Sequence, residues 1–357
     1  MNAKYWKYTT LLLRYTLGAV FLFSGAVKSF DTVGTAIYVE KYFAAFGFGS
    51  FDMLATPVAV LLGAVELTLG LLLLFNILTV VASTIAVVLL TVFTVITLLN
   101  ATVLPIGDCG CFGDALYLSP MATLLKNIVM LPMALLLCQR GGRSGMPRVL
   151  QWLMAAVIFS LSILLNIYVL RHLPIIDFMP YGEGVNLREE IIAERERVAN
   201  ATHSELRFVD KYSGEEYRFA ADDAECWLRD DLQFVDAVIV QDGADELRFG
   251  DFAIYDSEGR DVAQELLMYD GCQIWLVISV ASFGDKTKNA IDALYEKYDN
   301  CRVVVLTSAD YSDIKDVIES EWYYVDAMTL RSMIRADVGV LILDNGRIES
   351  KYNICDM

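Results

Sequence analysis

Positive charge is scarce in the second half of this sequence, and histidine is scarce throughout. Residues 171–357 contain 19 Lys and Arg against 39 Asp and Glu, a net charge of −20, whereas residues 1–170 have a net charge of +3. A surface with that much negative charge argues against nucleic acid and against anionic lipid headgroups as partners. The chain has two histidines and seven cysteines.

Charged residues are sparse in the first half because five long apolar stretches occupy most of it. Each stretch is long enough to cross a bilayer as an α-helix that rises about 1.5 Å per residue. We expect an all-α membrane region with spans near 11–29, 57–76, 78–100, 120–138 and 149–170. Lys4 and Lys7 would suit a signal peptide, but the first apolar stretch is longer than a signal core and further spans follow it. We therefore interpret it as an uncleaved helix.

The short loops differ in their content of positive residues. The N-terminus and the loop between the fourth and fifth spans contain Lys4, Lys7, Arg14, Arg140, Arg143 and Arg148. Because loops rich in Lys and Arg stay in the cytoplasm, the N-terminus is predicted to be cytoplasmic. The loops at 30–56 and 101–119, and everything after Arg171, are predicted to lie outside. This topology indicates a bacterial inner-membrane protein whose C-terminal part is in the oxidising periplasm.

The outer loop between the third and fourth spans is the part of the chain that most resembles a reactive site. It reads Pro105-Ile106-Gly107-Asp108-Cys109-Gly110-Cys111-Phe112-Gly113-Asp114. A disulfide between Cys109 and Cys111 would close a tight ring, and Gly110 tolerates the backbone that such a ring needs. Strained disulfides are oxidising and exchange readily, which suits a redox relay.

Three roles for this thiol pair stay open. The carboxylates of Asp108 and Asp114 disfavour thiolate formation, which argues against exchange. A structural bridge is therefore the alternative to a redox pair. A metal site is the weakest option, because two cysteines without a nearby histidine make a poor zinc set. We favour exchange by Cys109 and Cys111.

A carboxylate and a lysine lie inside the predicted spans. Glu66 is near the bilayer midplane in the second span, and Lys126 is at a similar depth in the fourth. Because ionised groups in a membrane are usually paired or functional, we expect a Glu66–Lys126 pair, with Lys28 as the alternative partner. A structural pair and a proton or quinone role are both open. The aromatic 30–56 loop is expected at the headgroup level, as an aromatic belt rather than a ligand lid.

The part after the last span is predicted to be soluble. Residues 173–250 are expected to form an adaptor with a charged helix at 187–198 and a hairpin around Ser213-Gly214. Residues 251–357 alternate strands and helices and end in a hairpin at Asn345-Gly346. The predicted elements are strands at 273–280, 302–307, 338–344 and 347–352, with helices at 285–298, 311–320 and 327–335.

This order of strands and helices resembles the thioredoxin fold. An enzyme of that fold would carry Cys-x-x-Cys after its first core strand, where this chain has Ala281-Ser282-Phe283-Gly284-Asp285-Lys286. The cis-proline expected before the final hairpin is also missing from 335–338. We therefore expect a degenerate domain that docks a partner. Cys272 and Cys301 could form a disulfide between adjacent strands, but two unrelated buried thiols are the expected outcome.

The N-terminal part resembles the DoxX/MauE group of membrane proteins, and the whole chain is similar to DoxX-type proteins of Bacteroidetes. The resemblance covers about 8–140 and rests on Asp-Cys-Gly-Cys-Phe-Gly-Asp, on the Lys126-Asn127 pair and on the intramembrane Glu66. It implies a four-helix bundle, to which this chain adds a fifth span. MauE is associated with maturation of a disulfide-rich periplasmic dehydrogenase subunit beside a thioredoxin-like partner, and DoxX with quinone-coupled oxidation.

These features predict a periplasm-facing thiol–disulfide protein that supports oxidative maturation of client proteins. Cys109 and Cys111 would exchange, with a quinone as the candidate electron acceptor and no metal. Supporting residues would be Asp108, Gly110, Phe112, Gly113, Asp114, Glu66, Lys126 and Asn127. The alternative is a non-catalytic scaffold whose degenerate domain binds a partner. The predicted parts are a bundle over 1–140, a loop and fifth helix over 141–172, an adaptor over 173–250 and the thioredoxin-like domain over 251–357.

Overall fold

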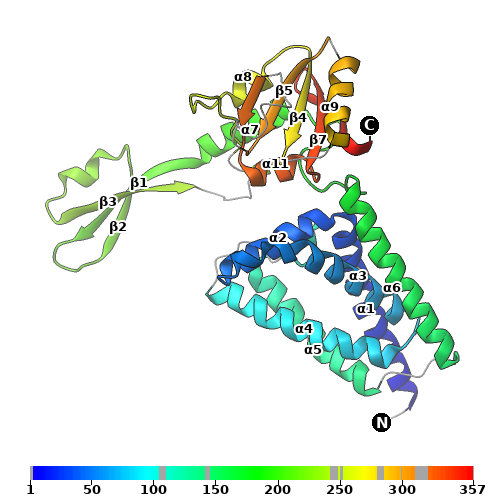
Figure 1. Ribbon diagram of the computed structural model, residues 1–357. Coiled ribbons are helices and arrows are strands. Elements are labelled where there is room, and N and C mark those ends of the chain that lie inside the picture. Colours follow the sequence, from blue (N-terminus) through cyan, green and yellow to red (C-terminus); the bar gives the residue numbers. More distant parts are fainter. Residues whose placement is uncertain are drawn as a thin grey trace.

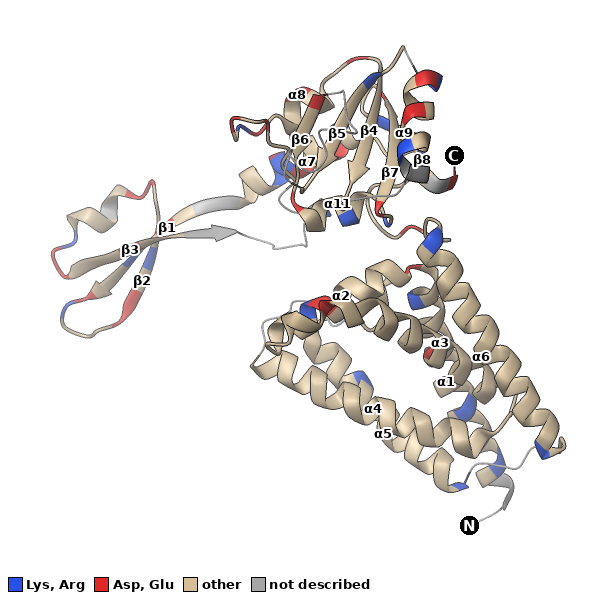
Figure 2. Cartoon of the chain, viewed as in Figure 1, with Lys and Arg blue, Asp and Glu red and all other residues tan. Residues whose placement is uncertain are grey.

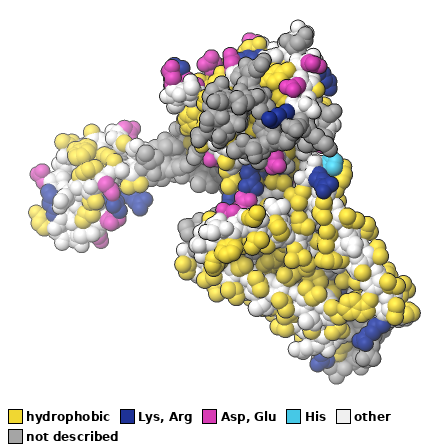
Figure 3. Space-filling model, in the orientation of Figure 1, with side chains coloured by type: hydrophobic (Ala, Val, Ile, Leu, Met, Phe, Trp, Pro, Cys, Tyr) yellow, Lys and Arg dark blue, Asp and Glu magenta, His cyan; other side chains and the backbone are white. Residues whose placement is uncertain are grey.

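The computed structural model describes residues 3–103, 110–140, 145–241, 248–249, 252–279, 285–298, 300–309 and 321–356. Within these ranges, five helices are long and apolar enough to cross a membrane by length and composition, as the sequence predicts. They form a bundle, and α6 (Arg148–Arg171) leads from it to the C-terminal half, which contains the sheets (Figure 1). Charged residues are concentrated in the C-terminal half (Figure 2), whereas the visible face of the bundle is mostly apolar (Figure 3). The chain is an integral membrane protein with a β-sheet-containing C-terminal domain.

The bundle consists of two closely packed helix pairs and α6. Helix α1 (Ala3–Phe30) packs along α3 (Ala55–Leu74), and α4 (Thr79–Thr102) packs along α5 (Pro120–Arg140), as Figure 1 shows. A Cβ atom at Gly25 would lie 2.1 Å from the backbone nitrogen of Leu67, and one at Gly70 would lie 2.4 Å from that of Leu22. Glycine at these two positions therefore lets the backbones of α1 and α3 touch.

The 30–56 segment between the first two spans is largely helical. Helix α2 (Thr32–Ala45) begins immediately after α1, and a 3-10 turn (Gly49–Leu54) leads into α3. The Asp31 carboxylate caps α2 by accepting a hydrogen bond from the Gly34 nitrogen at 2.7 Å. This N-cap starts a new helix where the first span ends. Hydropathy alone does not reveal it.

The residues after α6 first add buried side chains to the core of the C-terminal domain, among them Leu187 and Ile191, and then form an arm. Helix α7 (Leu187–Ala201) runs into β1 (Thr202–Asp210), which pairs antiparallel with both β2 (Glu216–Ala220) and β3 (Leu232–Gln241). The predicted hairpin around Ser213-Gly214 is confirmed. The three-stranded sheet projects away from the rest of the molecule (Figure 1).

The last part of the chain builds a five-stranded mixed sheet. Its strand order is β6-β5-β4-β7-β8; β4, β5 and β6 are parallel, and β7 and β8 each run antiparallel to their neighbour. The elements are α8 (Ala263–Leu267), β4 (Cys272–Ile278), α9 (Asp285–Lys297), β5 (Arg302–Thr307), β6 (Glu321–Tyr324), α11 (Ala327–Met333), β7 (Val338–Asp344) and β8 (Arg347–Asn353). Strand β6 was not predicted, and the helix expected at 311–320 lies outside the described residues.

Side chains alternate across the central strand of this sheet and form two cores. Trp275 and Val277 of β4 belong to the core on the face of α7, α8 and α11, whereas Ile274 and Leu276 belong to the core on the face of α9. All four are fully buried. The near-continuous apolar sequence of β4 thus reflects a strand that is covered on both faces.

Cys272 and Cys301 form a disulfide, so the expectation of two unrelated thiols is wrong. Strands β4 and β5 pair in parallel with Gln273 opposite Arg302. This register places the two preceding cysteines side by side at the start of their strands, with Cα atoms 5.0 Å apart, a separation at which a disulfide forms without moving the backbone.

Candidate functional site

A buried ion pair joins the two helices that pack most closely in the bundle. The Lys28 Nζ of α1 lies 2.9 Å from the Glu66 Oε2 of α3, and the two side chains are 4% and 1% exposed. The predicted Glu66–Lys126 pair is therefore wrong, and the alternative partner is the right one. Because α1 and α3 touch at Gly25, Lys28 is beside Glu66, whereas Lys126 is on α5, which packs along α4. The Lys126 Nζ lies instead 4.4 Å from the centre of the Phe112 ring.

Lys28 also binds the loop that contains Cys109 and Cys111 (residues 105–114, called the thiol loop below). The Lys28 Nζ donates hydrogen bonds to the Ser24 Oγ at 2.7 Å and to the Cys111 carbonyl oxygen at 2.5 Å. Ser24 donates its own hydroxyl to that carbonyl at 2.6 Å. The backbone at Cys111 is therefore fixed to an ion pair inside the bundle. Cys109 and Asp108, the other predicted members of this site, lie outside the described residues.

Glycine is required at two positions of this loop. Gly110 has φ +61°, and a Cβ atom there would lie 2.6 Å from the Tyr38 ring; Gly113 has φ +52°. Both backbones are in the left-handed region that favours glycine. Phe112 between them is buried and lies 5.3 Å from the Phe23 ring, centre to centre. The loop is thus bent sharply and packed down on α1 and α2.

Cys111 borders a large apolar cavity. The cavity has a volume of about 480 Å³ and is lined by residues of α1 to α5 and of the thiol loop. Its walls are mostly aliphatic and aromatic, and its few polar residues include Lys28, Glu66, Lys126 and Asn127. The aromatic residues that line it are Phe21, Tyr38, Tyr42, Phe43, Phe46, Phe48 and Phe93.

These walls change the interpretation of the aromatic segment at 30–56. Tyr38, Tyr42 and Phe43 are on α2 and line the cavity, as does Phe46 directly after this helix. This observation favours the ligand-lid alternative over a belt that only contacts headgroups. The site also gathers most of the predicted residues: Gly110, Cys111, Glu66, Lys126 and Asn127 line one cavity, Phe112 stacks under Lys126, and Asn127 donates to the Thr97 hydroxyl at 3.4 Å.

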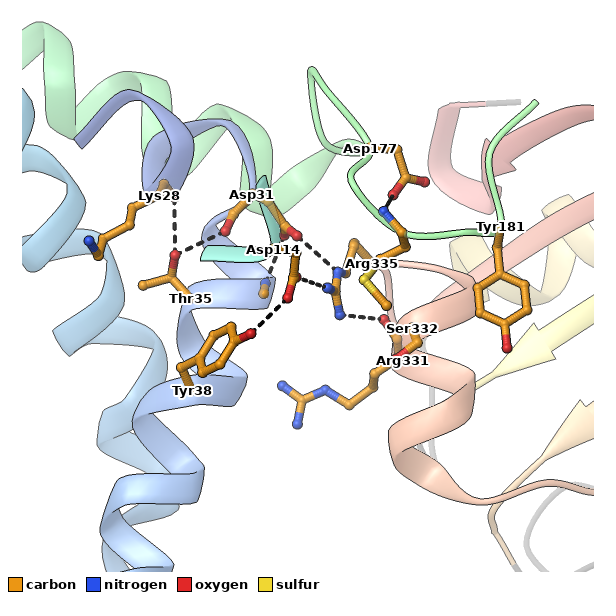
Figure 4. A network of polar contacts seen from close by, with 12 residues as sticks. Lys28, Asp31, Thr35, Tyr38, Asp114, Asp177, Tyr181, Arg331, Ser332 and Arg335 are labelled. Atoms are coloured by element: carbon orange, nitrogen blue, oxygen red, sulfur yellow. Dashed lines mark hydrogen bonds and ion pairs between the residues drawn. The ribbon is translucent and has the colours of Figure 1, made fainter. Parts of the chain in front are cut away.

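The C-terminal domain reaches the thiol loop through Arg335. This arginine follows α11 and is 3% exposed; its guanidinium donates to the Asp31 Oδ2 at 3.1 Å and to the Asp114 Oδ2 at 2.7 Å. Tyr38 donates its hydroxyl to the other oxygen of Asp114 at 3.0 Å. Figure 4 shows the Arg335 side chain facing both carboxylates. Asp114, which was predicted as a supporting residue and as a charge that disfavours a thiolate, is thus also part of the interface between the two halves.

A second arginine of α11 strengthens this interface. Arg331 binds both oxygens of Glu40 on α2, at 2.5 and 3.1 Å. On the side of the sheet, Ser279 at the end of β4 donates to the carbonyl oxygens of Ala336 and Asp337. The end of β4 is therefore attached to the turn that holds Arg335. Residues 281–284, which would follow β4 toward the site, lie outside the described residues.

Burial changes the acidity of one carboxylate in this interface. Removal from water raises the pKa of Asp31 above its ordinary value, and the Arg335 guanidinium and the Gly34 N–H oppose the shift without cancelling it. The nearby carboxylates of Asp114 and Asp177 raise this pKa further. As the pH falls, Asp31 therefore takes up its proton at a higher pH than an ordinary aspartate does.

Sequence reasoning missed Ser24, Asp31, Tyr38 and Arg335 as members of the site. One signal was available, because Ser24 and Lys28 are four residues apart and so lie on the same face of a helix. Arg331 and Arg335 have the same spacing. The contacts that these residues make with Cys111 and Asp114 span 76 to 221 residues of sequence, and no local pattern reveals them.

Comparison with known proteins gives a match to a family. Residues 6–140 match the family described as methylamine utilisation protein MauE. The match covers α1 to α5 and the thiol loop, and ends before α6. No curated protein and no solved structure matches the chain. The bundle is thus similar to a MauE-family membrane protein, which is consistent with an accessory role at a membrane.

Proposed function

We propose that this protein is a thiol–disulfide exchange protein of a bacterial inner membrane, with Cys109 and Cys111 as its exchanging pair. The observation that carries the proposal is the environment of Cys111. Its carbonyl oxygen accepts hydrogen bonds from Lys28 and Ser24, and the residue borders an apolar cavity that holds a buried ion pair. A loop that merely connected two spans would not need to be bound to charged groups inside the membrane.

The exchange starts with Cys109 and Cys111 as a disulfide. A client thiolate attacks one of the two sulfurs and forms a mixed disulfide, and a second client thiolate then displaces that sulfur. The client leaves with a new disulfide, and Cys109 and Cys111 remain as two thiols. Two electrons and two protons have then moved from the client to the pair.

A quinone is the candidate electron acceptor that returns the pair to its oxidised form. When bound, a quinone supplies the capacity to take up two electrons and two protons. The residues present fit such a group. The cavity volume of about 480 Å³ and its aromatic walls are those of a small-molecule pocket, and Glu66 and Lys126 provide an acceptor and a donor among the lining residues.

The C-terminal domain would bring clients to the loop. In this proposal, residues 1–140 form the DoxX/MauE-like bundle, 141–172 add the fifth span, 173–250 form the adaptor, and 251–357 form a thioredoxin-like domain without a dithiol. The parallel β4–α9–β5 unit beside the antiparallel β7–β8 hairpin supports a thioredoxin-like interpretation. The position of Arg335 beside the thiol loop supports a role in positioning.

The orientation belongs to the same proposal. The Lys and Arg residues of the N-terminus and of the loop before α6 would keep those segments in the cytoplasm. The thiol loop and the C-terminal domain would then share the periplasm. The contacts of Arg335 support this arrangement, because they require both to be on one side of the membrane.

A scaffold role is the second candidate function. It is favoured by the two arginines of the C-terminal domain that are bonded to the bundle, because a fixed interface suits an assembly factor as well as an enzyme. In that case, a Cys109–Cys111 bridge would only stiffen the loop.

Trapping the redox state of the loop in living cells separates the two functions. Cells are quenched in acid, and free thiols are labelled with a maleimide that adds mass, in wild type and in a matched Cys138→Ser variant. We expect a mixture of labelled and unlabelled Cys109 and Cys111 that shifts to the dithiol form when respiration is blocked. A pair that stays oxidised under every condition, with Cys109→Ser/Cys111→Ser cells that keep the wild-type phenotype, would establish the scaffold role instead.

A further inference from the structure

The polar groups that line the cavity differ in how many of their hydrogen-bond donors and acceptors already have partners. A lysine ammonium has three N–H donors, and the three acceptors around Lys28 are Ser24, Glu66 and the Cys111 carbonyl. Lys28 therefore has no donor left for a ligand. Ser24 has no donor left either, because its single hydroxyl hydrogen goes to the Cys111 carbonyl, and its oxygen already accepts from Lys28.

Glu66 is the exception. Its Oε2 accepts from Lys28, but its Oε1 is buried and has no hydrogen-bond partner among the residues that the structure describes. The residue is 1% exposed and lines the cavity. A buried carboxylate oxygen without a donor is unfavourable, so the site is complete only when a ligand supplies an N–H or O–H group.

Lys126 has the opposite requirement. It lines the same cavity, and in the described part of the chain its ammonium contacts the Phe112 ring but donates no hydrogen bond. A hydroxyl oxygen and a carbonyl oxygen both accept hydrogen bonds. Lys126 can therefore bind either kind of head group and does not discriminate between them.

We propose that Glu66 makes the cavity selective for the hydroxyl form of a lipid-soluble redox carrier, a quinol, over its carbonyl form, a quinone. The choice of a quinone as the carrier rests on the proposed function; the selectivity rests on Glu66. A quinol donates one hydroxyl to the Glu66 Oε1 and accepts from Lys126, whereas a quinone leaves the Oε1 without a donor. By linkage, a site that binds the reduced form more tightly makes the bound carrier a stronger oxidant of the adjacent thiols.

The test measures binding without electron transfer. Protein that carries Cys109→Ser/Cys111→Ser is placed in lipid nanodiscs, so that no thiol reacts with the probe. A fully substituted, short-tailed benzoquinone and its quinol, kept under argon, are each titrated by calorimetry against empty nanodiscs as a blank. Because the acceptor is charged, we expect the quinol to bind about tenfold more tightly than the quinone. Equal affinities, or no binding of either probe, would overturn the proposal.

Substitution of Glu66 gives a sharper prediction. In Glu66→Gln, Lys28 still requires an acceptor, so the amide carbonyl turns to Lys28 and the NH₂ group faces the cavity. The lining acceptor becomes a donor, and the preference should invert in favour of the quinone. A matched buried change outside the cavity, Ser162→Ala, should leave the tenfold preference intact. A preference for the quinol that survives in Glu66→Gln would exclude Glu66 as its cause.

Two further variants keep the test informative if Glu66→Gln does not fold. Lys28→Met/Glu66→Gln has no unpaired charge in the membrane, and its affinities for the two probes should be equal. Lys126→Met should lower the affinity for both probes by the same factor and leave the ratio of the two affinities unchanged. Because every titration uses protein without the thiol pair, a failure of thiol cycling in cells would disprove the proposed function without affecting these ratios.

Discussion

Arg335 of the C-terminal domain donates a hydrogen bond to Asp114, three residues after Cys111 in the thiol loop. The same guanidinium binds Asp31 at the start of α2. One side chain therefore connects the turn before β7, the second helix of the bundle and the loop that carries the thiols. Any motion of the C-terminal domain relative to the bundle must break these contacts or move the loop.

Removing the Arg335 guanidinium should separate the two halves. In Arg335→Met, Asp31 and Asp114 lose their common partner while Asp31 remains buried, and breaking a buried pair in this way costs about 3–5 kcal/mol. We expect faster proteolysis of the segment after α6 and a lower thermal midpoint in detergent. The exposed Arg347, whose ion pair with Glu349 is loose at 3.8 Å, provides the control. An Arg335→Met protein as resistant as Arg347→Met would show that this contact does not hold the halves together.

The raised pKa of Asp31 predicts a pH dependence with a definite sign. Its pKa is above the ordinary value of 3.8 in the folded protein, chiefly because the carboxyl is buried. The folded state then binds more protons than the unfolded state, so the contribution of Asp31 to stability is greatest below pH 3.8 and falls as the pH rises through the raised pKa.

Asp31→Asn isolates this effect. Asparagine caps a helix about as well as aspartate, and it cannot titrate. Thermal midpoints are compared between wild type and the variant from pH 4 to pH 8, so that the contributions of the other titrating groups cancel in the difference. The thermal midpoint of the variant should rise relative to that of wild type as the pH rises. A difference that is constant over the whole range, or that has the opposite slope, would contradict the raised pKa.

Gly110 should tolerate no side chain. Alanine there must adopt φ +61° and would place its Cβ atom 2.6 Å from the Tyr38 ring; a non-glycine residue in the left-handed region costs about 1–3 kcal/mol before any clash. Gly110→Ala should displace the loop and make Cys111 react faster with a water-soluble alkylating reagent. Gly182→Ala is the matched control, because a Cβ atom there has no neighbour within 4 Å. Equal reactivity in both variants would mean that the loop does not depend on this glycine.

The Cys272–Cys301 disulfide should stabilise the five-stranded sheet. The two residues are 29 positions apart, and closing a loop of that length restricts the unfolded chain by about 3–4 kcal/mol. Cys272→Ala/Cys301→Ala should lower the thermal midpoint of the C-terminal domain, and dithiothreitol should lower that of the wild type by the same amount. The double variant should not respond to the reductant. Wild-type protein that is also unaffected would indicate that the bond is absent or contributes nothing.

The sequence predicted the parts of this fold whose signal is local. Five spans, the hairpin at Ser213-Gly214 and strand β5 (Arg302–Thr307) follow from hydropathy, turn residues and strand pattern. Helix α2 was missed because its start depends on the cap by Asp31 rather than on hydropathy. Strand β6 is short and only partly buried, so its alternation gave no usable signal.

The candidate site was only half predictable. Glu66, Lys126 and the thiol loop are unusual in their own sequence neighbourhood and were found for that reason. The choice between Lys28 and Lys126 as partner of Glu66 depends on which helices touch, and that is set by Gly25 and Gly70 together. For Arg335 the sequence offers only its four-residue spacing from Arg331, because its partners Asp114 and Asp31 are 221 and 304 residues away in the chain.

The close contact between α1 and α3 also determines how a hydrophobic molecule would enter from the lipid. Helices whose backbones meet at two glycines separate only with large loss of packing, so they behave as one rigid wall. The opposite wall, α4 with α5, is attached at both of its ends. The Leu78 nitrogen before α4 donates to the Gln151 side chain of α6 at 2.9 Å, and Cys111 in the loop before α5 is bonded to Lys28 and Ser24 of α1. A hydrophobic molecule from the lipid would therefore pass beside α4 or α5 rather than between α1 and α3.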